Sequence, residues 1–155
     1  MNLRGAPRTI LAGMLIVGAM DFAYASLATV LRGGSFTRLW QFVGSGLLGK
    51  AAFEMGVAGV LCGVACHFLI MGAFAAAICL LYKKVPLIEK QPMVSGVLYG
   101  IGIWLVMNFV VVPLSNTGTG APPMALNAVM NLGFAMHLVI GLSLVLIARR
   151  GLRPA

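Results

Sequence analysis

The chain contains one eight-residue pattern twice, as GVACHFLI at residues 63–70 and as GFAMHLVI at residues 133–140. Both copies read G-x-A-x-H-x-x-I, and they contain His67 and His137, the only two histidines of the sequence. Each copy lies inside a long apolar run of the length that crosses a bilayer. The repeated pattern therefore predicts two membrane-spanning helices, each with one polar side chain at a corresponding position.

A second, shorter motif precedes each copy, as MDF at residues 20–22 and as MNF at residues 107–109. Asp21 and His67 are 46 positions apart, whereas Asn108 and His137 are 29 positions apart. The difference of 17 positions is close to the length of segment 35–49. We therefore expect two related helical hairpins that form a parallel internal repeat, with an insertion in the first hairpin.

The composition indicates a membrane protein. Of the 155 residues, 61% are hydrophobic and only 9% are charged, which is too little polar surface to cover a soluble globule. Apolar runs of about 20 residues or more occur at residues 9–31, 55–82, 92–114 and 124–148. Because backbone polar groups in a bilayer must be hydrogen-bonded within their own segment, each run should be a helix. We expect residues 1–155 to form a single membrane domain, an all-α bundle of four transmembrane helices.

Segment 35–49 is shorter than these runs and is amphipathic. Its apolar side chains recur at helical spacing, and its polar side chains lie on the opposite face. The apolar positions are Phe36, Leu39, Trp40, Val43 and Leu47, and the polar positions are Thr37, Arg38 and Gln41. Ser35 is a suitable N-cap for this helix. We predict an interfacial amphipathic helix, with a re-entrant segment as the alternative interpretation.

The net charge of +8 follows the predicted topology. If the four spans alternate in direction, eight basic residues fall on one side of the membrane and three on the other. The first group is Arg4, Arg8, Lys83, Lys84, Lys90, Arg149, Arg150 and Arg153, and the second is Arg32, Arg38 and Lys50. Basic residues collect in cytoplasmic loops, so both termini should be cytoplasmic. The basic ends would attract anionic lipid headgroups. Nucleic-acid binding is excluded, because it needs a basic face in water.

Four polar side chains lie deep inside the predicted spans. Counted from the flanking basic residues at a helical rise, Asp21 and His137 lie roughly 20 and 18 Å deep, and His67 and Asn108 roughly 24 and 27 Å deep. Ionisable groups in a bilayer are costly and are often functional. We therefore predict that these four residues form a layer that binds or passes a proton, a cation or a small polar ligand.

Two alternatives to a ligand site remain open. In the first, an Asp–His and an Asn–His hydrogen bond only lock the helices together, and the protein is a structural or accessory subunit. In the second, His67 and His137 are the axial ligands of a single b-type haem. Gly63, Gly133 and Gly141 lie one turn from a histidine and would leave room for a porphyrin, an arrangement that resembles diheme cytochrome b. We assign no other cofactor and no metal ligand.

The residues do not indicate an enzyme. The chain has no Gly-rich phosphate loop, no Ser/His/Asp arrangement and no paired carboxylates in its spans. The three cysteines, Cys62, Cys66 and Cys79, all fall within one predicted span and do not form a disulfide framework. Hydrolytic chemistry is therefore unsupported.

From Cys66 to Arg150 the chain carries a further series of motifs. They are H-x-x-I, Tyr82, Val85-Pro86, Gln91, Gly96, Gly100, Val112-Pro113-Leu114, the histidine of the fourth span and Arg149-Arg150. This series resembles the YagU-like inner-membrane proteins of unknown function, over a little more than half of the chain. The resemblance implies a four-span protein of the bacterial inner membrane and no particular activity. Besides the lipid bilayer, a homo-oligomer or a larger membrane complex is the partner left open.

Overall fold

The computed structural model describes residues 5–118 and 128–153, and in this part of the chain every regular element is a helix. The α-helices are α1 (Ala6–Ala12), α2 (Gly18–Leu31), α3 (Phe36–Leu48), α4 (Val57–Tyr82), α5 (Pro86–Lys90), α6 (Pro92–Val106), α7 (Val112–Leu114) and α8 (Ala128–Leu152). A short 3-10 helix, Gly49–Phe53, follows α3. Arg4 and the first residues of the predicted fourth span, 124–127, lie outside the described residues.

Two of the long helices contain a π-helical turn instead of a break. Gly13–Val17 (η2) joins α1 to α2, and Met107–Val111 (η4) joins α6 to α7. Ala6–Leu31 and Pro92–Leu114 are therefore continuous helices, and Val57–Tyr82 and Gly133–Leu152 complete a set of four that are long and apolar enough to cross a membrane. Within the described residues, the prediction of an all-helical chain with four spans is confirmed, with bounds close to those expected.

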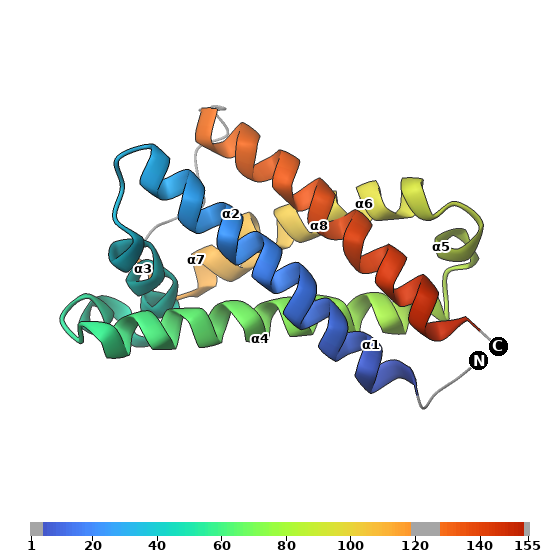
Figure 1. Ribbon diagram of the computed structural model, residues 1–155, viewed down its shortest axis with the longest axis horizontal. Coiled ribbons are helices and arrows are strands. Elements are labelled where there is room, and N and C mark those ends of the chain that lie inside the picture. The colour runs from blue at the N-terminus through green and yellow to red at the C-terminus, as the bar shows by residue number, and fades with distance from the viewer. Residues whose placement is uncertain (1–4, 119–127, 154–155) are drawn as a thin grey trace.

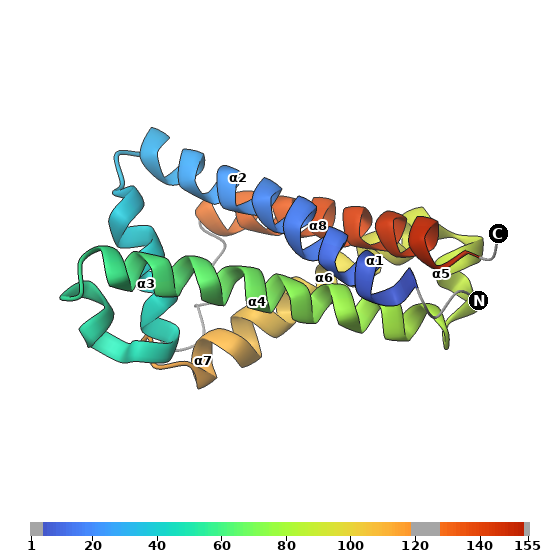
Figure 2. The ribbon, with the colours of Figure 1, turned by 60° about the horizontal axis from the view of Figure 1, so that its bottom comes forward.

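The four long helices form one bundle (Figures 1 and 2). The α1–α2 helix, α4 and α8 pack against one another, and α6 packs mainly along α8. The beginning of α1, the end of α8 and α5 lie at one end of the bundle, whereas α3 and α7 lie at the other. Large apolar side chains such as Leu15, Leu61 and Leu69 are exposed on the outside, where a bilayer would cover them.

The tightly packed core occupies the half of the bundle nearer to α5. Its most buried side chains include Val17 of η2 and Ile140, Leu144 and Val145 of α8. The α6–α8 contact is a seam of small residues, because a Cβ atom on Gly141 would overlap the backbone of Gly100. Small residues let helix backbones approach closely in lipid, so this seam holds α6 against α8.

Helix α3 lies against the N-terminal half of α4, and its orientation differs from the predicted one. Trp40 is 1% exposed and Gln41 is buried as well, whereas Leu47 of the predicted apolar face is exposed. The placement of Gln41 on the polar, outward face is therefore wrong. The cause is the close approach of the two backbones at Gly44 and Gly63, which turns the small-residue face of α3 toward α4.

The ends of α3 follow local rules that are visible in the sequence. The side chain of Ser35 accepts a hydrogen bond from the backbone N–H of Arg38, with 3.3 Å between the heavy atoms, so the predicted N-cap is confirmed. At the other end, the backbone N–H of Asn116 donates to the carbonyl of Gly46 and its side chain donates to the carbonyl of Leu47. These bonds tie α3 to the segment after α7.

Candidate functional site

A cavity of about 210 Å³ lies between the helices, on the side of the bundle that α3 covers. It is lined by Asp21, Ala25, Leu39, Trp40, Val43, His67, Ile70, Met71, Phe74, Ile103, Met107, His137 and Ile140. These residues come from all four long helices and from α3. Three of the four residues predicted to form a polar layer line this one cavity, and the fourth, Asn108, does not.

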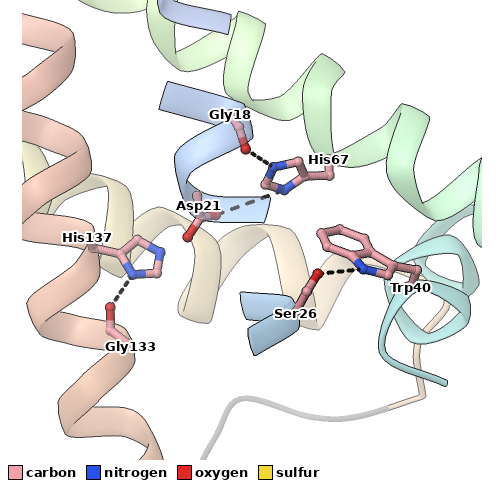
Figure 3. Close-up of polar contacts among 7 residues, drawn as sticks. All are labelled: Gly18, Asp21, Ser26, Trp40, His67, Gly133 and His137. Carbon is pink, nitrogen blue, oxygen red and sulfur yellow. Dashed lines mark hydrogen bonds and ion pairs between the residues drawn. The ribbon is translucent and has the colours of Figure 1, made fainter. Parts of the chain in front are cut away.

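His67 connects α4 to α2 by both of its ring nitrogens (Figure 3). Its Nε2 lies 3.0 Å from the carbonyl oxygen of Gly18, and its Nδ1 lies 3.9 Å from Oδ2 of Asp21. Because a carbonyl oxygen only accepts, Nε2–H is the donor of the first contact. In a neutral ring Nδ1 then carries a lone pair, which faces the carboxylate of Asp21.

His137 faces the same carboxylate from α8, with its other ring nitrogen bound to the backbone. Its Nδ1 lies 2.6 Å from the carbonyl oxygen of Gly133, one turn earlier on the same helix, and therefore carries the donated proton. Figure 3 shows the ring of His137 turned toward Asp21 from the side opposite to His67. In a neutral ring Nε2 of His137 is thus a second acceptor on the cavity.

The carboxylate of Asp21 has no hydrogen-bond donor among the residues that the structure describes. His67 approaches it to 3.9 Å, which is too long for a hydrogen bond. The side chain is 23% exposed, and Asp21 lines the cavity. A carboxylate in a membrane interior is costly without a partner. With both imidazoles neutral, three acceptors face this space, and the complementary group is a donor or a cation.

Trp40 of α3 forms part of the cavity wall, a role that the sequence analysis did not predict. Its ring stacks on Phe22 at a centroid distance of 4.4 Å and meets the ring of His67 edge-on at 5.2 Å. Its Nε1–H donates to Oγ of Ser26, 3.1 Å away. The sequence does contain a signal for the packing of α3 on α4. Gly59 and Gly63 have the G-x-x-x-G spacing that is typical of a close contact between helices.

Asn108 is outside the cavity and lies within the π-helical turn Met107–Val111. Its Nδ2 donates to the carbonyl oxygen of Trp104, 2.8 Å away on the same helix. Met107 lines the cavity instead. Asn108 and His137 each bond to their own helix, so the predicted Asn–His hydrogen bond is not formed between them.

The geometry does not favour a haem between His67 and His137. The space beside Gly63 is filled by the carbonyl of Trp40, and the space beside Gly141 is filled by the backbone of Gly100. Gly63 and Gly141 thus admit a neighbouring helix and leave no room there for a porphyrin, whereas a Cβ atom on Gly133, the third glycine of that alternative, would meet nothing within 4 Å. The residues present therefore do not fit the haem alternative.

The arrangement suits a bound proton or a cation with N–H donors better than a bare metal ion. Among the described residues, no three His, Cys, Asp or Glu side chains are close enough to hold one metal ion. A proton needs only one of these groups, and an ammonium group reaches its acceptors through N–H bonds, so its acceptors can lie further apart than metal ligands. In comparisons with known proteins, no family model, no curated protein and no solved structure matches this chain.

Proposed function

We propose that the protein is a multi-pass membrane protein that binds a proton or a small cation at a buried site formed by Asp21, His67 and His137. The observation that carries this proposal is the carboxylate of Asp21, which faces a cavity, has no hydrogen bond to a described residue and lies between the rings of His67 and His137. A proton or a cation at this place removes the cost of the buried negative charge.

The two backbone contacts of the histidines support this assignment. The carbonyls of Gly18 and Gly133 hold one nitrogen of each ring as a donor, so the other nitrogen is presented to the cavity. Imidazole is the side chain that ordinarily changes charge between about pH 5 and 8. Uptake of a proton by either ring would turn its inner nitrogen from an acceptor into a donor toward Asp21. The site can therefore exchange a bound cation for protons.

A pH titration of the tryptophan fluorescence tests the site. In a Trp104→Phe background, Trp40 is the single fluorophore and its ring touches that of His67. We expect its emission to change with pH, because uptake of a proton at the site changes the charge beside the indole ring. Asp21→Asn should shift or abolish this change, because it removes the charge that the imidazoles face. Asn108→Ala is the matched control and should titrate like the parent. An Asp21→Asn variant with an unaltered titration would contradict the proposal.

We propose further that the protein lies in a bacterial inner membrane with both of its termini in the cytoplasm. The support is the charge distribution, since Lys83, Lys84, Arg149 and Arg150 belong to the end with α5, whereas Arg32 belongs to the end with α3. Anionic headgroups are the proposed partners of the basic end. Reporter fusions after Lys84 and Arg150 should read cytoplasmic, and a fusion at Gly33 should read external. An external reading after Arg150 contradicts this topology.

The duplication of the hairpin and the resemblance to YagU-like proteins also stay proposals. The duplication is supported by the two motifs of each half and by the presence of one π-helical turn in each span that carries M-[DN]-F. The turns differ in position, because Gly13–Val17 precedes Asp21 whereas Met107–Val111 contains Asn108.

A homo-oligomer or a larger membrane complex is the proposed assembly, and cross-linking in native membranes tests it.

A structural role is the second candidate function. It is favoured by the hydrogen bond from His67 to the carbonyl of Gly18, which joins α4 to α2 across the bundle. Polar contacts of this kind hold helices together in lipid. If this were the whole role, the titration of Trp40 would not depend on Asp21, and the variants would change only the stability of the bundle.

A further inference from the structure

We propose that the ligand of the cavity is a primary ammonium ion with a small apolar body. This inference rests on the proposed cation site at Asp21 and names the chemical class of the cation. It is carried by three properties of the cavity, which are the number of its acceptors, the character of its remaining walls and its volume.

The acceptors of the site match the donors of a primary ammonium group. When both rings are neutral, His67 offers Nδ1 and His137 offers Nε2 beside the carboxylate of Asp21, while the other ring nitrogens are held by backbone carbonyls. A primary ammonium carries three N–H donors and no acceptor, as the side chain of lysine does. A quaternary ammonium carries the charge without a donor, and an alcohol carries one donor without the charge. Neither of these satisfies the three acceptors.

The rest of the cavity wall is apolar and suits a hydrocarbon group. Apart from Asp21, His67 and His137, its lining consists of aliphatic, methionine and aromatic side chains and one alanine. The indole N–H of Trp40 is already bonded to Ser26 and is not available to a ligand. Apolar walls do not hold water well, whereas they bind apolar molecules of fitting size. One end of the ligand should therefore be an ammonium group, and the remainder should be apolar.

The volume limits the apolar body to a few carbon atoms. An apolar protein cavity of about 150 Å³ can bind benzene. The present cavity measures about 210 Å³, which accommodates an ammonium group with a chain or ring of roughly six carbons. Hexylammonium is a suitable probe, because alkyl amines have a pKa near that of lysine, about 10.4, and are protonated at pH 7.

The experiment is a titration of the Trp104→Phe protein in lipid nanodiscs with hexylammonium, followed by Trp40 fluorescence and by isothermal titration calorimetry. Trp104 can be removed because it packs against Phe109 and Phe134 and does not line the cavity. We expect saturable binding that Asp21→Asn weakens by about tenfold or more, since a charge-assisted contact is lost. Asn108→Ala should bind like the parent and controls for partition of the amine into lipid.

Two further probes and one further variant separate this inference from the proposed function. Hexanol and tetraethylammonium should each bind about tenfold more weakly than hexylammonium, because each lacks one of the two recognised features. Ala25→Leu fills part of the cavity and leaves Asp21 in place, so it should block hexylammonium and keep the pH response of Trp40.

Three results would overturn the ammonium assignment. They are equal affinity for hexanol and hexylammonium, equal affinity of the parent and Asp21→Asn, and the absence of both heat and fluorescence change on titration. If the pH response of Trp40 still depends on Asp21 in that last case, the site is a proton site and the proposed function stands. If this dependence is missing too, both proposals fail.

Discussion

His67 and His137 occupy the same position of the same sequence pattern, yet their rings make different contacts. His67 reaches across to Gly18 and faces Asp21 on α2, whereas His137 bonds to Gly133 on its own helix. The neighbours of the two copies explain the difference. Helix α3 covers the first histidine with Trp40, and within the described residues the second copy has no such cover. A repeated motif therefore specifies where a polar group lies along a helix, and the surrounding elements specify its partner.

The glycines that open the two motifs provide the strongest test of this comparison. Gly63 lies against the carbonyl of Trp40, whereas a Cβ atom on Gly133 would meet nothing within 4 Å. Gly63→Val should cost about 2–3 kcal/mol of unfolding free energy, because the α3–α4 contact is overpacked. Gly133→Val should change the stability by about 0.5 kcal/mol or less, as surface substitutions do. Unfolding of both variants in mixed detergent micelles, followed by circular dichroism, measures the difference, and equal costs would remove the distinction.

Exchanging the two polar residues of the M-[DN]-F motifs tests whether the halves are interchangeable. The double variant Asp21→Asn/Asn108→Asp keeps the composition and moves the carboxylate to position 108 in η4, which does not line the cavity. We expect it to lose the pH response of Trp40 and to bind hexylammonium about tenfold more weakly than the parent. Fluorescence and calorimetry check this. A double variant that keeps the pH response of Trp40 would show that a side chain at position 108 reaches the cavity.

The smallest expected difference is the one between the costs in unfolding free energy of replacing His67 and of replacing His137. His67→Gln removes an interhelical hydrogen bond and should cost about 0.6 kcal/mol, a typical value for polar contacts within membranes. His137→Gln removes a bond within α8 and should cost less. Both variants should nevertheless alter the pH response of Trp40, since both rings face Asp21. A His137→Gln variant that unfolds more easily than His67→Gln would contradict the difference in contacts.

Much of the site was accessible from the sequence, and the reasons are local. Asp21 and His67 were candidates because ionisable residues are rare inside apolar runs, and the cavity does contain them together with His137. The prediction for Asn108 depended on treating the second motif as a copy of the first. That step fails because Met107, and not Asn108, lines the cavity, and no residue of the M-N-F motif by itself predicts the π-helical turn in which both lie.

The sequence by itself determined the four long apolar helices and the positions of the polar residues along them. Both follow from the length of the apolar runs and from the rise of a helix, which depend only on neighbouring residues. The tertiary structure alone decided that α3 turns Trp40 and Gln41 inward and that no donor among the described residues reaches Asp21. These features depend on backbone contacts between Gly44 and Gly63 and on the rotation of whole helices. Such contacts join residues far apart in the chain, so no local pattern contains them.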